Sequence, residues 1–134
     1  MKIMKFGGTS VGTPQRMNQV LELINADDKA KIVVLSALSG TTNALVNISN
    51  AIAEGYRKEA QHKIEELENH YRKFVETLVQ SEDARQKANA IVSEHFEFLN
   101  IILKISFSEA LNKDILAQGE LLSTKLFSVF LEEK

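Results

Sequence analysis

The chain has 134 residues, of which 44% are hydrophobic and 25% are charged, and its formal net charge is −2. This length suits one domain, and the balanced charge gives no reason to expect nucleic-acid binding, since proteins that bind a duplex usually show a clustered basic excess. No apolar run approaches the length of a membrane span, the first residues lack the apolar core of a secretory signal, and the absence of cysteine excludes disulfides. We therefore expect a cytoplasmic protein that binds neither nucleic acid nor membranes.

The beginning of the chain predicts a strand, a helix and a second strand. Met1–Phe6 is short, mostly apolar and followed by glycines, which is typical of a buried strand. Thr13 is a suitable N-cap and Pro14 a suitable first helical residue. Apolar residues then recur at helical spacing at Met17, Val20, Leu21 and Ile24. Because Lys31–Leu35 is apolar and β-branched, we expect a second buried strand, parallel to the first, with a right-handed crossover.

A loop of small residues follows over 36–42. The next helix turns an apolar face inward at Leu45, Ile48 and Ile52, and Gly55 is a suitable residue for ending it. Thr42 is a candidate N-cap for this helix, a structural role that is compatible with contact to a ligand.

Long helices account for the rest of the chain. One is predicted from 56 to about 80, another over about 82–104, and the last from near Asn112. Three charge pairs at a spacing of four residues support the first of them: Glu54–Lys58, Glu59–Lys63 and Glu68–Arg72. The three histidines have no spacing suited to a metal ion, and we predict no metal site: His62, His70 and His95.

The number of predicted strands is too small for a complete sheet. Parallel sheets are buried on both faces and normally hold more than two strands. The sequence also ends on Glu132-Glu133-Lys134 without a returning strand. We therefore expect residues 1–134 to be the first part of a longer domain. Surface left uncovered in the isolated segment would favour non-native self-association.

The loops after the two predicted strands carry the residues best suited to chemistry. Carboxyl ends of parallel strands lie at one edge of a sheet, where open α/β sheets bind ligands. Lys5 and the residues 7–10 leave the first strand there, and 36–42 leave the second. Backbone N–H groups, hydroxyls and an ammonium suit phosphate binding. The glycine order fits neither the Walker A nor the G-x-G-x-x-G pattern, so these residues alone indicate either a phosphate site or a tight turn.

Three motifs resemble those of aspartokinases, members of the amino acid kinase superfamily. Lys5–Val11 reads K-F-G-G-T-S-V, residues 33–45 resemble a V-V-S-A…G-x-T-N-x-L pattern, and Gly119–Ser123 resembles G-E-x-x-S. The resemblance covers nearly the whole chain. It implies an α/β, carbamate kinase-like fold, of which residues 1–134 would be the N-terminal portion of a single catalytic domain. An ATP-binding second half and ACT regulatory domains would then lie outside this sequence.

The resemblance also implies an activity. ATP, with Mg²⁺, would phosphorylate the side-chain carboxylate of L-aspartate to give 4-phospho-L-aspartate for lysine, threonine and methionine biosynthesis. Lys5 would be the catalytic residue, and the phosphates of ATP would bind Lys5, Gly7, Gly8, Thr9 and Ser10. Aspartate would contact Ser39, Thr42 and Glu120. We expect a homo-oligomeric full-length enzyme and an inactive isolated segment.

Two other functions remain open. One is a kinase of the same superfamily for another carboxylate or a phosphate, and the other is a non-catalytic helical module that binds partners. An ordinary exposed glutamate is the structural alternative for Glu120. However, glycine inside a helix costs about 0.5–1 kcal/mol relative to alanine. The neighbouring Gly119 therefore predicts the close approach of a loop or a ligand to this helix.

Overall fold

A computed structural model describes residues 1–7, 11–105 and 108–133. The predicted strand–helix–strand unit and the long helices are confirmed, and the last helix begins earlier than predicted. The elements of the described segments are β1 (Lys2–Phe6), α1 (Pro14–Ile24), β2 (Lys31–Leu35), α2 (Thr41–Ala53), α3 (Arg57–Leu78), α4 (Glu82–Leu103) and α5 (Glu109–Glu133). The two strands are parallel. None of the helices in these segments is long and apolar enough to cross a membrane.

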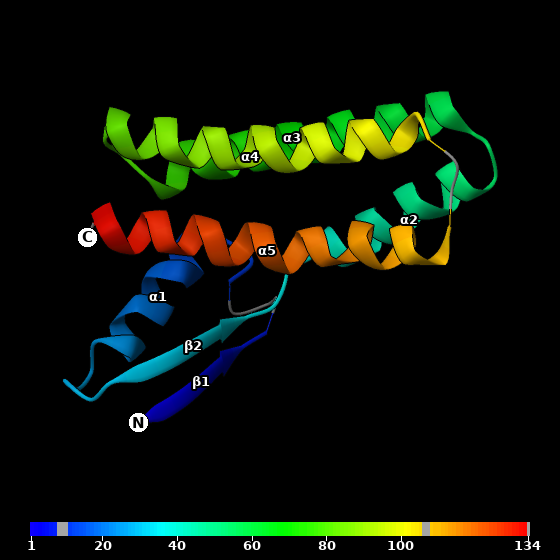
Figure 1. The fold of residues 1–134 in the computed structure, drawn as a ribbon. Helices are drawn as coiled ribbons and strands as arrows, with labels where there is room; N and C mark the ends of the chain where they lie inside the picture. Colours follow the sequence, from blue (N-terminus) through cyan, green and yellow to red (C-terminus); the bar gives the residue numbers. More distant parts are fainter. Residues whose placement is uncertain (8–10, 106–107, 134) are drawn as a thin grey trace.

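Helix α5 occupies the centre of the molecule. Figure 1 shows the sheet on one side of α5 and the α3–α4 pair on the other. Helix α5 contacts β2, α2 and α4, while α3 packs against α2 and α4. Large side chains from three helices are fully buried in the core between them, including Tyr71, Phe96 and Phe130. Because elements pack against it on both sides, α5 is a rigid support for the residues that it carries.

The strands are buried on one face only, so the prediction of two buried strands is wrong in this respect. Side chains alternate between the two faces of a strand. Phe6 and Leu35, which are partners in the ladder, pack against the helical core. On the other face Ile32 and Val34 are 48% and 45% exposed. The helices of the described segments cover one face of the sheet, and Lys5, the ladder partner of Val34, lies on the open face.

The N-cap predicted at Thr13 is confirmed, whereas the candidate N-cap at Thr42 is wrong. Thr13 Oγ1 accepts a hydrogen bond from the backbone N–H of Arg16 at 3.1 Å, and Pro14 begins α1. Helix α2 is instead preceded by Gly40, whose φ of 84° lies in the left-handed region. Glycine adopts this geometry without steric strain. Thr42 is therefore the second residue of α2, and its side chain is exposed.

Gly55 directly follows Glu54, the C-cap of α2, in the stop position that the sequence predicts. The φ of Gly55 is 83°, and its N–H donates to the carbonyl of Ile52 at 3.1 Å. The N–H of Tyr56 donates to the carbonyl of Ala51 at 2.8 Å. These two hydrogen bonds satisfy carbonyl groups that the last turn of a helix otherwise leaves without partners.

Two of the three predicted charge pairs along α3 are confirmed. Lys63 lies 3.9 Å from Glu59, and Arg72 lies 2.8 Å from Glu68. The third prediction, Glu54 with Lys58, is wrong as a pair within one helix. Glu54 is the C-cap of α2, and α3 begins after it.

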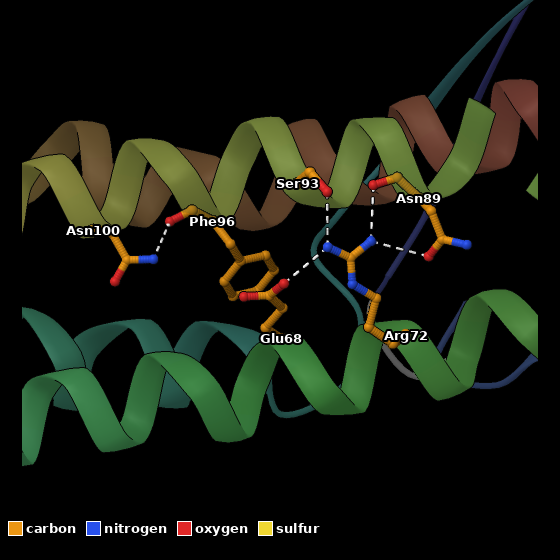
Figure 2. Close-up of polar contacts among 6 residues, drawn as sticks. All are labelled: Glu68, Arg72, Asn89, Ser93, Phe96 and Asn100. Atoms are coloured by element: carbon orange, nitrogen blue, oxygen red, sulfur yellow. Dashed lines mark hydrogen bonds and ion pairs between the residues drawn. The ribbon is translucent and has the colours of Figure 1, made fainter. Parts of the chain in front are cut away.

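Arg72 also joins α3 to α4, as Figure 2 shows. Its Nη1 donates to the carbonyl and the side-chain oxygen of Asn89 at 2.8 and 3.0 Å. Its Nη2 donates to Glu68 and to the hydroxyl of Ser93, both at 2.8 Å. Hydrogen bonds from a charged donor are roughly twice as strong as neutral ones. The guanidinium therefore fixes the register of the α3–α4 pair.

Candidate functional site

The carboxyl ends of β1 and β2 open onto a cavity of about 290 Å³. The cavity is lined by residues from both strand ends and by one residue of α5: Lys5, Phe6, Gly7, Val34, Leu35, Ser36 and Glu120. Ligands of open α/β sheets bind at this edge. The structure thus brings three of the predicted site residues, Lys5, Gly7 and Glu120, to one cavity.

Lys5 and Glu120 give this cavity groups of opposite charge. Both side chains are exposed, and neither forms an ion pair with another residue in the part of the chain that the structure describes. An ammonium binds phosphate or carboxylate oxygens, and a carboxylate binds an ammonium group. The cavity is therefore suited to a ligand that carries both charges.

Gly119 allows α5 to approach the end of β2. A Cβ atom at position 119 would lie 2.8 Å from Cβ of Ala37, and 3.3 Å from side-chain atoms of Leu45 and Thr41. Carbon atoms in van der Waals contact are about 3.5–4.0 Å apart. Only a residue without a side chain fits here, and the close neighbour that the sequence predicted at this glycine is the loop after β2.

Ser123 bonds to the same loop from the next turn of α5. Its hydroxyl donates to the carbonyl of Ser36 at 2.7 Å, and the side chain is fully buried. Neither Ser36 nor Ser123 is among the predicted site residues, although Ser123 is the last residue of the G-E-x-x-S motif. A signal was present, because residues four apart on a helix share a face, and Ser123 follows Gly119 by four.

The remaining predicted site residues do not line this cavity. Ser39 is exposed and lines a separate cavity of about 350 Å³ between α2 and α3, together with Lys63. Thr42 is not among the residues that line either cavity. Three predicted phosphate-binding residues lie outside the described residues: Gly8, Thr9 and Ser10.

Residues 1–134 match the model of the amino acid kinase family over their whole length. The chain belongs to this family.

Aspartokinases are among the proteins to which the chain is similar. Lysine-sensitive aspartokinase 3 of Escherichia coli (strain K12) is 32% identical over 132 residues, which are 98% of this chain and 28% of that protein. Chloroplastic aspartokinase 3 of Arabidopsis thaliana is 36% identical over 142 residues, which cover 98% of this chain and 24% of that protein. The chain therefore spans less than a third of the length of either relative.

Solved structures agree with the family assignment. E. coli aspartokinase III in complex with aspartate and ADP superposes with a TM-score of 0.76 at 30% identity, over 99% of this chain and 29% of that one. The complex of the same enzyme with lysine and aspartate gives a TM-score of 0.78 at 29% identity. The predicted amino acid kinase fold and the predicted resemblance to aspartokinases are confirmed.

His95 is buried in a hydrogen-bond network between α4 and α5. The ammonium of Lys125 lies 3.0 Å from Nε2 of His95. Because an ammonium can only donate, Nε2 accepts and the ring proton is on Nδ1, which donates to Gln118.

Among residues 1–7, 11–105 and 108–133, no group of three or more His, Cys, Asp and Glu side chains could hold a metal ion.

Proposed function

We propose that the protein containing these residues is an aspartate kinase, which transfers the γ-phosphate of Mg²⁺-bound ATP to the side-chain carboxylate of L-aspartate. The observation that carries this proposal is the meeting of Lys5 and Glu120 at one cavity, in a chain similar to aspartokinases. The solved E. coli relative is a complex with aspartate and ADP. The product, 4-phospho-L-aspartate, feeds lysine, threonine and methionine biosynthesis, and we place the enzyme in the cytoplasm.

The reaction requires neutralisation of charge more than transfer of a proton. A carboxyl group with a pKa of about 3.9 is ionised at neutral pH, so the aspartate side chain can attack the γ-phosphorus directly while ADP leaves. No general base is needed. The main obstacle is repulsion between the carboxylate and the phosphate oxygens, and the ammonium of Lys5 offsets it. Lys5 is the proposed catalytic residue.

The other roles follow from the chemistry of each group. Gly7 lines the cavity, and we propose that its backbone binds the ATP phosphates together with Gly8, Thr9 and Ser10. The carboxylate of Glu120 would bind the α-ammonium group of aspartate, which explains a negative charge in a site for anions. Ser39 and Thr42 stay proposed aspartate contacts. Ser39 lies in the loop that continues from Ser36, which lines the cavity, and Thr42 is the second residue of the helix that follows this loop.

We further propose that residues 1–134 are the N-terminal portion of a single catalytic domain. The ATP-binding second half and the ACT regulatory domains would lie elsewhere in a homo-oligomeric full-length protein. Two observations support this: the chain spans 28% of its E. coli relative, and one face of its sheet is open. The isolated segment would then be inactive and would self-associate.

An assay of the full-length protein tests the proposal. Incubation with L-aspartate and Mg²⁺-ATP, followed by trapping with hydroxylamine, should yield the aspartyl hydroxamate, whereas L-glutamate should yield none. Phosphorylation of a different acceptor, with none of aspartate, would assign another kinase of the family. A protein with no thermal shift in the presence of aspartate and an ATP analogue would instead be a non-catalytic helical module.

A further inference from the structure

We propose that Ser123 is a positioning residue that sets the spacing across the aspartate subsite. This inference rests on the proposed aspartate kinase function. Ser123 is not among the residues that line the cavity. It acts through Ser36, which does line it, because the Ser123 hydroxyl donates to the Ser36 carbonyl at 2.7 Å.

Ser36 is attached to both walls of the cavity. Its N–H donates to the carbonyl of Phe6 at 3.1 Å, on the strand that carries Lys5. Its carbonyl is held by Ser123, which follows Glu120 by three residues on α5. Two hydrogen bonds through one residue therefore connect the strand that presents the ammonium with the helix that presents the carboxylate.

Two opposed contacts fix the separation of these walls. The Cα of Gly119 is packed so closely on the loop that an added Cβ would be 2.8 Å from Ala37, so α5 cannot move nearer. The Ser123 hydrogen bond prevents α5 from moving away. Ser123 is 0% exposed, so solvent cannot readily replace this bond. One steric limit and one hydrogen bond thus locate the loop after β2 against the part of α5 that carries Glu120.

A positioning role and a purely structural role predict different kinetics. A loss of general stability would lower the measured kcat in proportion to the folded enzyme that remains, and would not raise the KM for aspartate selectively. A change in the spacing between Ser36 and Glu120 alters the geometry around aspartate and should therefore raise the KM for aspartate. The KM for ATP should change little, because the phosphates of ATP bind the loop after β1. Misplacement by about 1 Å can reduce activity by as much as a hundredfold.

The kinetic test compares Ser123→Ala with Ser128→Ala in the full-length protein. Ser128 is an exposed residue of the same helix. Below the unfolding temperature of each variant, Ser123→Ala should raise the KM for aspartate roughly tenfold and change the KM for ATP by no more than about twofold. Ser128→Ala should retain both wild-type values. Ser123→Cys, which keeps a weaker donor, should give an intermediate KM for aspartate and replaces the alanine variant if that variant does not fold.

Hydrogen exchange provides a readout that does not depend on catalysis. The Ser36 N–H donates to Phe6, so the peptide spanning 31–40 should exchange faster in Ser123→Ala than in Ser128→Ala. Equal exchange together with an equal KM for aspartate would overturn the proposal, and so would a parallel rise in both KM values. If the wild-type protein forms no aspartyl phosphate, the proposed function fails, and the exchange result alone decides the role of Ser123.

Discussion

The phenolic oxygen of Tyr71 lies 2.8 Å from the hydroxyl oxygen of Thr41, and both side chains are buried. The hydrogen bond joins the first residue of α2 to the middle of α3. Helix α2 follows directly on the loop that leaves β2, so this bond holds the far end of the loop against the helical core.

Tyr71→Phe should lower the free energy of unfolding by about 1–3 kcal/mol, because it leaves the buried Thr41 hydroxyl without its partner. Thr41→Val should have a similar cost. The double variant removes both polar groups and should cost less than the sum of the two single changes. Urea unfolding of the four proteins measures this coupling. Strictly additive losses would show that the hydrogen bond contributes nothing.

Stability should fall at alkaline pH through Tyr71. Burial raises the pKa of Tyr71 to about 12, and the hydrogen bond with Thr41 partly offsets this rise. The unfolded chain loses the phenol proton near the usual value of 10, whereas the folded protein keeps it. Stability is therefore lost as the pH rises from about 10 through about 12. Tyr71→Phe should lack this part of the decline in urea unfolding, and Tyr56→Phe, at a residue 57% exposed, is the matched control.

Glu120→Gln should raise the KM for aspartate or lower kcat by roughly tenfold or more, because the amide cannot replace a charged hydrogen bond to an ammonium group. Steady-state kinetics of the full-length enzyme measure both constants. Glu109→Gln, on the exposed first turn of α5, is the control and should keep wild-type kinetics. Unchanged kinetics in Glu120→Gln would remove this residue from the site.

Gly119→Ala should destabilise the protein, although alanine is the better helix former by about 0.5–1 kcal/mol. Its Cβ would lie 2.8 Å from that of Ala37, which has no flexible side chain that could move aside. Adding Ala37→Gly removes this clash and should restore much of the lost thermal stability. A rise in Tm for Gly119→Ala alone would show that the loop and α5 are not in fixed contact.

Acid should weaken the other end of the sheet through Asp27. Hydrogen bonds from Lys2, the backbone of Lys29 and Lys31 hold the pKa of Asp27 well below its usual range. The unfolded chain takes up this proton near pH 3.9, whereas the folded protein stays ionised at lower pH. The contribution of the ionised Asp27 carboxylate to stability is therefore present at neutral pH and is lost as the pH falls through the folded-state pKa.

Asp27→Asn should consequently lower Tm at pH 7. The difference in Tm between this variant and the wild type should become smaller as the pH falls. Asp28→Asn, at the exposed neighbouring residue, is the control and should leave Tm close to that of the wild type. A difference between Asp27→Asn and the wild type that stays constant from pH 7 to pH 2 would contradict this account of the carboxylate.

The sequence predicted the elements where local signals decide them. Thr13 and Pro14 mark the start of α1, and Gly55 marks the end of α2, because caps depend on neighbouring residues only. The start of α2 was misplaced because a hydroxyl was assumed to cap it. Gly40 precedes the helix in place of the predicted Thr42. The hydroxyl of Thr41 bonds to Tyr71, a partner thirty residues away that no local pattern identifies.

The candidate site was predicted only in part, because its contacts join residues that lie far apart in the sequence. The cost of Gly119 in a helix predicted a close neighbour, but the sequence could not show that this neighbour is Ala37. The bond between Ser123 and Ser36 spans 87 positions. The exposure of Ile32 and Val34 could not be predicted either. An apolar sequence is typical of a buried strand, and only the packing around the sheet shows which face is covered.

The open sheet has a practical consequence for work with this segment. With the order β1–β2, each strand has one edge that no other described strand pairs with, and Ile3 on the uncovered face is 67% exposed. Unpaired strand edges are templates on which further chains add. When residues 1–134 are produced by themselves, we therefore expect these edges to favour polymers, and dilution should favour the monomer by mass action.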